Sequence, residues 1–326
     1  MTKTSKKYRN FLQFTVKISV IIAAFYFIYY RLFFNENLDI NTLNKQVINA
    51  VFKNHNSIII LLVLTALNWF MEILKWQILV SNIQKINLIE ATEQTLAAHT
   101  GALLTPNRIG EYGIKAIYFD KKNQKKIMLL NLIHHMLQMT VTVMFGIVGT
   151  IYLIKHYNIE LPKIKYHKII YYTTGIILIF IMGNTVIHKK IRTFYWNKIV
   201  HFLKNTPKKI LITGFILSVL KYIIFVHQFI YLAYLFEVKI NYTEFLLLLF
   251  AFYLLASVLP SIPIFDWIIK GSVAIMILQF AGVNEVTATI ITTIMWFLNF
   301  AIPAILGSYF ILKFKKQPYL YQKSKI

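Results

Sequence analysis

The sequence predicts an all-α polytopic membrane protein with six transmembrane helices and two re-entrant helical hairpins. Of its 326 residues, 57% are hydrophobic and only 14% are charged. A soluble chain of this length needs more polar surface, so the composition predicts a membrane protein. The 35 Lys and Arg residues against 12 Asp and Glu give a formal charge of +23. These charges cluster between apolar runs, which is the positive-inside pattern and favours anionic lipid, not nucleic acid, as the partner.

Six apolar runs approach the roughly 20 residues that a helix needs to cross the hydrocarbon core. The first run begins after a basic N-terminus but lacks a small-residue cleavage site, so we interpret it as a retained helix and not as a signal peptide. The predicted spans are residues 14–34, 57–80, 127–154, 168–187, 210–236 and 286–312.

Two further stretches are interrupted at their centres. Residues 88–119 contain TPNRIGE, and residues 244–282 contain LPSIPIFDW. Each is too long for one comfortable crossing and is broken in the middle, so we expect each to enter the membrane and return to the same side. The residues expected to shape the two hairpins are Thr105, Pro106, Gly110, Pro260, Pro263 and Gly271.

The distribution of basic residues predicts the orientation. With six spans and two hairpins, the segments on the side of the N-terminus carry 21 Lys and Arg, and the opposite loops carry seven. Because basic residues are retained in the cytoplasm, both termini are expected there, in a protein integral to the cell (inner) membrane.

The predicted elements repeat with inverted orientation inside a single membrane domain, residues 1–326. Residues 14–154 contain two spans, the hairpin 88–119 and a third span, and residues 168–312 repeat this order from the other side with the hairpin 244–282. The hairpin tips EYGIKA and DWIIKG share an acid, an aromatic residue, an isoleucine, a lysine and a small residue. Inverted repeats with broken helices near the midplane are a recurring transporter design.

The first hairpin holds the strongest candidate site. Arg108 offers a planar fork suited to phosphate, and Lys115 lies one turn after Glu111, at the start of the returning helix. We interpret this group as a lipid-phosphate site in which Glu111 orients Arg108 or Lys115. The alternative is a hairpin whose charges merely neutralise one another.

Three further ionisable residues are candidates for substrate binding. Asp266 and Lys270 are spaced for a helical ion pair, and either pairing alone or a role in binding explains them. Lys221 lies near the middle of a predicted span, so we expect it to face a cavity and to pair with an acid or a phosphate.

Other polar and aromatic residues have simpler interpretations. His99 is a possible polar group of the cavity. Lys75 is expected to extend to the cytoplasmic interface, accompanied by Glu72. His134 and His135 are adjacent on a helix and so should face apart, with ordinary helix contacts. Interfacial belts are expected to contain Trp69, Trp76, Tyr26, Tyr29 and Tyr30.

No motif predicts catalysis or a cofactor. The chain has no cysteine, no HExxH and none of the common nucleophile or nucleotide-binding signatures. We therefore expect no metal, no cofactor and no enzymatic activity.

At LLTPNRIGEYGIKA the chain resembles the lysylphosphatidylglycerol synthase transmembrane-region family of flippase-like integral membrane proteins. The residues of the resemblance are Thr105, Pro106, Arg108, Gly110 and Glu111, followed by the basic Lys115. Some relatives carry a soluble aminoacyl-transferase domain, and we expect none here because only residues 313–326 follow the last predicted span. The resemblance implies movement of a lipid between leaflets.

Three functions remain open from the sequence. The leading hypothesis is a lipid translocase that holds an anionic phosphate headgroup between the two halves. The second is an integral-membrane enzyme acting on a lipid, and the third is a scaffold for a cell-envelope enzyme, with no cavity.

Overall fold

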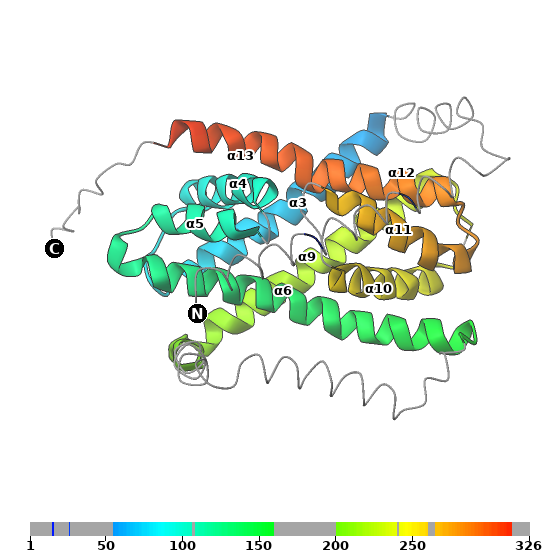
Figure 1. Ribbon diagram of the computed structural model, residues 1–326, viewed down its shortest axis with the longest axis horizontal. Coiled ribbons are helices and arrows are strands. Elements are labelled where there is room, and N and C mark those ends of the chain that lie inside the picture. The colour runs from blue at the N-terminus through cyan, green and yellow to red at the C-terminus, as the bar shows by residue number, and fades with distance from the viewer. Residues whose placement is uncertain are drawn as a thin grey trace.

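The computed structural model describes residues 55–105, 108–159, 200–239, 241–259 and 265–314, together with Thr15 and Tyr26. The first half of this chain forms four helices (Figure 1). They are α3 (His55–Val80), α4 (Leu88–Leu104), α5 (Ile109–Ile117) and α6 (Lys121–His156).

The second half begins with α9 (Lys208–Leu235) and α10 (Tyr242–Val258). It continues with α11 (Asp266–Leu278), the 3-10 turn η4 (Gln279–Ala281) and α12 (Glu285–Trp296). A five-residue π-helix, η5 (Phe297–Ala301), joins α12 to α13 (Ile302–Lys313) without a break. No strand occurs in the described ranges.

Four helical segments are long and apolar enough to cross a membrane: Asn56–Val80, Lys121–His156, Lys208–Leu235 and Glu285–Lys313. They coincide with four of the six predicted spans, so the protein is an α-helical integral membrane protein. The predicted spans 14–34 and 168–187 lie outside the described residues, apart from Thr15 and Tyr26. Both interrupted stretches form two helices with a break between them, as expected, while their re-entrant course stays a prediction.

Asparagine caps start the helices at several of the loops. Asn87 accepts a hydrogen bond from the backbone of Glu90, whose side chain accepts one from the backbone of Asn87, and this capping box begins α4. Asn241 and Asn284 cap α10 and α12 without a reciprocal contact, their side-chain oxygens accepting from backbone N–H groups of the first turn. These caps supply partners to backbone N–H groups that the first helical turn leaves unpaired.

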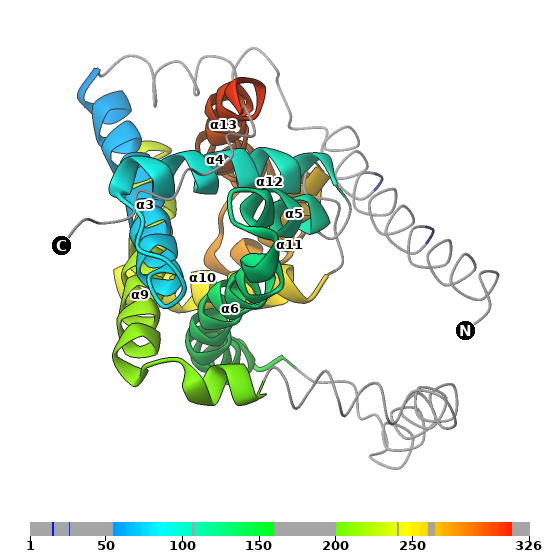
Figure 2. The same cartoon turned by 90° about the vertical axis from the view of Figure 1, so that its left-hand side faces the viewer.

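The two halves contact each other reciprocally. The helix before the break in one half packs against the last long helix of the other, so α4 contacts α13 and α10 contacts α6. The equivalent helices α3 and α9 contact each other directly. Figure 2 shows these three pairs around the centre of the molecule. Reciprocal contacts are what an inverted repeat requires, although the inverted orientation in the membrane stays a prediction.

Glycines permit the closest of these helix contacts. A Cβ atom on Gly307 of α13 would lie 2.0 Å from the carbonyl oxygen of Leu96 in α4. A Cβ atom on Gly149 of α6 would lie 2.4 Å from the carbonyl oxygen of Leu247 in α10. Small residues at these crossings let the backbones touch, as is usual for helices packed in a membrane.

Candidate functional site

The break between α4 and α5 is built by one strained residue and a close glycine contact. Arg108 has a left-handed backbone, with φ of 56°, and begins α5. Gly110, which we expected to shape this hairpin, does not itself break the helix, because it lies inside the first turn of α5. The lack of a side chain at Gly110 lets α5 approach α4 closely, since a Cβ atom there would lie 2.3 Å from the carbonyl oxygen of Gly101 in α4. Thr105 links the two helices, accepting from the N–H of Gly110 at 2.8 Å and donating to the carbonyl of Gly101 at 2.6 Å.

Glu111 is the acceptor of a first cluster, here called the Glu111 centre, with Arg108, Lys115 and His135. Its Oε2 lies 3.0 Å from an Arg108 guanidinium nitrogen, and its Oε1 lies 3.2 Å from Lys115 Nζ and 2.8 Å from His135 Nε2. The Glu111 side chain is 4% exposed and that of Lys115 is 1% exposed. The expected contacts of Glu111 with both Arg108 and Lys115 are therefore present.

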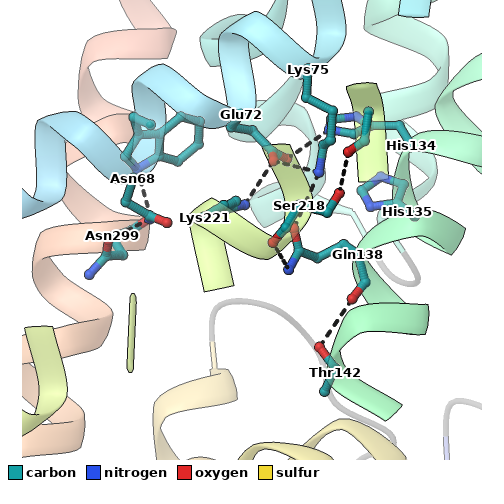
Figure 3. A network of polar contacts seen from close by, with 12 residues as sticks. Asn68, Glu72, Lys75, His134, His135, Gln138, Thr142, Ser218, Lys221 and Asn299 are labelled. Atoms are coloured by element: carbon teal, nitrogen blue, oxygen red, sulfur yellow. Dashed lines mark hydrogen bonds and ion pairs between the residues drawn. The ribbon is translucent and has the colours of Figure 1, made fainter. Parts of the chain in front are cut away.

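Glu72 of α3 is the acceptor of a second cluster, the Glu72 centre, with Lys75, Lys221 and His134. Its Oε2 lies 2.9 Å from Lys75 Nζ and 2.8 Å from Lys221 Nζ, and its Oε1 lies 3.2 Å from His134 Nε2. Figure 3 shows these side chains converging from α3, α6 and α9. The acid that we expected opposite Lys221 is thus Glu72.

The two carboxylate centres have the same composition and are joined. Each holds one glutamate, two cationic side chains and one of two adjacent histidines. His134 contacts Glu72 and His135 contacts Glu111, and the two rings stack with centroids 5.4 Å apart. Lys115 bridges them, since its Nζ lies 3.3 Å from His134 Nδ1 and 2.7 Å from Asn131 Oδ1. The same ammonium lies 4.1 Å from the centre of a Trp76 ring, a cation–π contact.

The π-helix η5 adds a buried ladder of amides. Asn299 Oδ1 accepts from Asn68 Nδ2 at 2.8 Å, and Asn299 Nδ2 donates to Gln228 Oε1 at 2.9 Å. His99 Nε2 lies 3.1 Å from the carbonyl oxygen of Phe300. A π-helical turn misaligns the backbone ladder and is common at functional sites, and here side chains of α3 and α4 contact two of its carbonyls, with Trp69 Nε1 donating to Asn299 at 3.3 Å.

The second broken helix presents its own ion pair. Asp266 and Lys270 lie in the first turns of α11, with Oδ2 and Nζ 2.6 Å apart. Lys270 Nζ also lies 4.6 Å from the centre of the Phe300 ring. The ion pair that the sequence spacing allows is formed.

A cavity of about 510 Å³ lies between these groups. Both broken helices contribute to its wall, through Arg108 on one side and Asp266 and Lys270 on the other. Each carboxylate centre contributes one cation to the wall, Arg108 from the Glu111 centre and Lys221 from the Glu72 centre. The polar wall residues are Asn68, Glu72, His99, Arg108, His135, Gln138, Thr142, Lys221, Ser257, Asp266, Lys270 and Asn299, and the aromatic ones are Trp69, Tyr222, Phe225, Tyr253 and Phe300.

The structure places the predicted substrate-binding residues in two layers. Arg108, Lys221, Asp266 and Lys270 line the cavity, as does His99, the expected polar group. Glu111 and Lys115 lie directly behind Arg108 and His135 and do not form part of the wall.

Of the predicted hairpin residues, Thr105 lies at the first break and Gly110 lies in the first turn of α5. Gly271 is buried in the second turn of α11. Pro106, Pro260 and Pro263 lie outside the described residues.

Three interpretations of other polar and aromatic residues were also wrong. Lys75 does not reach an interface but is 1% exposed, because Glu72 and the Gln138 amide oxygen are its partners. Trp76 is fully buried and not interfacial, with Nε1 donating to Gln94 Oε1 at 2.8 Å. His134 and His135 are not limited to ordinary helix contacts, because they contact the carboxylates of Glu72 and Glu111 on other helices. Tyr29 and Tyr30 lie outside the described residues.

Sequence reasoning treated Glu72 and His135 as secondary, although both line the cavity. One signal was available: Asn68, Glu72 and Lys75 recur at helical spacing on one face of an otherwise apolar span. Such a polar stripe predicts a face turned toward protein or a cavity, not toward lipid. No spacing in the sequence signals that His135 meets Glu111.

No group of histidine or acidic side chains in the described ranges has the arrangement of a metal site. The apolar helices and the cavity define a class: an α-helical integral membrane protein with a charged cavity between two broken helices.

The lysylphosphatidylglycerol synthase TM region family matches residues 15–307, so the chain belongs to this family, as the hairpin motif predicted. Membership in this family points to a membrane protein involved in lipid modification or transport. Neither a curated protein nor a solved structure matches the chain.

Proposed function

We propose that the protein translocates a lipid with an anionic phosphate headgroup between leaflets, the headgroup occupying the cavity while the acyl chains stay in lipid. One observation carries the proposal: each carboxylate centre holds two cationic side chains for one carboxylate. With neutral histidines, each centre has one positive charge in excess, and protonated histidines increase the excess.

An excess of positive charge in a low-dielectric site is costly unless an anion compensates it. Each centre presents one of its two cations to the cavity, Arg108 and Lys221 respectively. A phosphate placed between them would be compensated from both centres at once. Arg108 suits this role because its guanidinium binds phosphate oxygens in a bidentate manner, and its side chain is 38% exposed.

The carboxylates explain how the empty cavity remains stable. Without ligand, Glu111 and Glu72 hold Arg108 and Lys221 in ion pairs of 3.0 and 2.8 Å. When phosphate arrives, these cations contact it while Lys115 and Lys75 stay behind to pair with the same carboxylates. In both states every cation therefore contacts an anionic group, and the arriving phosphate balances the excess positive charge of the empty centres.

The test is transfer of fluorescent phospholipids between the leaflets of proteoliposomes, for wild type beside Arg108→Ala and Lys125→Ala. Lys125 is an exposed basic residue at the start of α6, away from the cavity wall, and serves as the matched control. We expect Arg108→Ala to lower transfer of an anionic phospholipid by at least tenfold, since a charge-assisted contact contributes about 1.5–3 kcal/mol. Wild-type protein that transfers no phospholipid, or Arg108→Ala that transfers at the wild-type rate, would refute the proposal.

The contact between Glu111 and His135 supports a second candidate, an enzyme acting on a lipid. A carboxylate 2.8 Å from a histidine that faces a cavity is a general acid–base pair in geometry. Mass spectrometry of a lipid extract incubated with pure protein tests this candidate. A product that forms with wild type but not with His135→Gln would favour the enzyme.

The scaffold hypothesis predicts both cations paired with protein acids and no cavity. The pairs are present, but so is a cavity lined by both broken helices. We therefore rank the scaffold below the other two.

A further inference from the structure

Two buried tyrosines of the cavity wall have hydroxyl groups without a partner. Tyr222 of α9 is 4% exposed and Tyr253 of α10 is 8% exposed. Among the described residues, neither hydroxyl has a hydrogen-bond partner, although both side chains line the cavity. Leaving a buried hydroxyl unpaired costs about 1–3 kcal/mol, so an orphaned pair in a cavity wall points to a ligand that supplies the missing bonds.

These hydroxyls belong to a part of the wall that differs from the phosphate side. Lys221 extends from α9 toward Glu72 of α3, whereas its neighbour Tyr222 extends toward α6 and α10. The Tyr222 ring stacks on Phe145 with centroids 5.2 Å apart and meets the Tyr253 ring edge-on at 6.2 Å. Aromatic contacts thus fix both rings on the α6–α10 side of the cavity.

The neighbouring wall groups are neutral and can also form hydrogen bonds. Thr142 lies on α6, where its hydroxyl donates to the Gln138 carbonyl at 3.2 Å and keeps lone pairs for an incoming donor. Ser257 lies one turn after Tyr253 on α10 and lines the cavity as well. Hydroxyl groups both donate and accept, whereas a phosphodiester anion only accepts. The side with four hydroxyls therefore suits a ligand that has donors and acceptors of its own.

The volume supports a headgroup larger than phosphate. Cavities of about 300–1,000 Å³ hold molecules of drug size, and this one has about 510 Å³. A phosphate between Arg108 and Lys221 fills a small part of that space. The remainder is bounded by aromatic rings and by the neutral hydroxyls of Tyr222, Tyr253, Thr142 and Ser257.

From this arrangement we infer that the cavity selects a polyol phosphate headgroup: Arg108 and Lys221 hold the phosphate, and the hydroxyls of Tyr222 and Tyr253 bind the hydroxyl groups of the polyol. The inference rests on the proposed function and names its substrate class. The polyol can be a glycerol or a cyclitol or sugar ring, and the same chemistry recognises each of them.

The test compares binding of short-chain lipids to the purified full-length protein in detergent, by isothermal titration calorimetry. The ligands are dioctanoyl phosphatidylinositol, phosphatidylglycerol and phosphatidylmethanol. All three are singly charged phosphodiesters, but phosphatidylmethanol has no headgroup hydroxyl. The variants are Tyr222→Phe, Tyr253→Phe and their double variant. The control is Tyr234→Phe, because Tyr234 lies on α9 like Tyr222 but is 74% exposed.

We expect wild type to bind at least one polyol lipid tighter than phosphatidylmethanol. Each single substitution should weaken polyol binding by about fivefold, the equivalent of one neutral hydrogen bond. The double variant should lose most of the preference for polyol lipids over phosphatidylmethanol. Its affinity for phosphatidylmethanol should equal that of wild type, and Tyr234→Phe should bind all three lipids as wild type does. Tighter binding of phosphatidylinositol would show that the site prefers a ring, and tighter binding of phosphatidylglycerol would show that it prefers a glycerol.

Other results separate the two proposals. Equal affinity of wild type for all three lipids, or a preference that survives in the double variant, would overturn the polyol inference and leave phosphate binding intact. Arg108→Ala should lower the affinity for all three lipids by the same factor. If wild type bound none of them, the proposed function itself would fail. Because Tyr→Phe keeps the ring and its contacts and removes only an unpaired hydroxyl, the variants should unfold at no lower a temperature than wild type, which confirms that they fold.

Discussion

Replacing Glu111 with glutamine tests whether the buried carboxylate holds the first centre together. Glutamine keeps the shape of the side chain and one acceptor oxygen but removes the charge. The Nζ of Lys115 lies 3.2 Å from that carboxylate and the lysine side chain is 1% exposed. At an effective dielectric constant of about 20, an ion pair at this distance has a Coulomb attraction of roughly 5 kcal/mol.

The net loss is smaller than this attraction, because Lys115 keeps other partners. It still contacts Asn131 Oδ1 at 2.7 Å and the Trp76 ring at 4.1 Å. Removing one member of a buried ion pair typically destabilises a protein by about 3–5 kcal/mol, so Glu111→Gln should lower the free energy of unfolding by about 3 kcal/mol. The double variant Glu111→Gln with Lys115→Met should recover part of this loss, since it removes both charges.

The assay is unfolding in mixed micelles with increasing SDS, followed by circular dichroism. Glu237→Gln is the control, since this carboxylate is exposed in the loop after α9. A Glu111→Gln variant as stable as Glu237→Gln would refute the reasoning. So would a double variant that is less stable than Glu111→Gln by the full cost of a second lost partner.

The same assay checks three further substitutions. Gly307→Ala should destabilise by about 1–3 kcal/mol, because the new Cβ would lie 2.0 Å from the Leu96 carbonyl oxygen. Gly113→Ala should instead stabilise by up to about 1 kcal/mol, because nothing lies within 4 Å of the new Cβ and alanine favours a helix. Equal effects at these two glycines would contradict the close contact of α4 with α13. Asn299→Ala should cost about 1–3 kcal/mol, since it removes the acceptor of the Asn68 Nδ2 group and the donor to Gln228 Oε1. An unchanged unfolding midpoint for Asn299→Ala would show that the amide ladder does not stabilise the fold.

Much of the architecture could be predicted from the sequence because lipid imposes strong rules on it. Apolar length located four described spans within a few residues, and internal breaks located both pairs of half-helices. The i,i+4 spacing of Glu111 with Lys115 and of Asp266 with Lys270 predicted two ion pairs that are formed. These features depend on local rules, which a single sequence contains.

The positions of several site residues could not be predicted, because they depend on contacts between helices that are distant in the sequence. Lys75 was expected at an interface because its distance from the helix end allowed snorkelling. Whether a lysine does so depends on its partners, and the sequence does not show that Glu72 and Gln138 both contact Lys75. His134 and His135 on α6 contact two carboxylates, Glu72 and Glu111, which lie on two other helices. Residue spacing alone does not determine such meetings.

The most direct test of lipid passage uses the absence of cysteine from the chain. Ser257→Cys places a thiol in the cavity wall, at an exposed position, and Ser81→Cys places one at the exposed end of α3, outside the cavity. The rate of modification by a methanethiosulfonate reagent is then measured in proteoliposomes with and without an added short-chain anionic phospholipid, and transfer is measured afterwards. We predict that the lipid slows modification at position 257 only, and that modification there abolishes transfer. If added lipid leaves the modification rate unchanged at both positions, and modification leaves lipid transfer unchanged, the headgroup does not pass through this cavity.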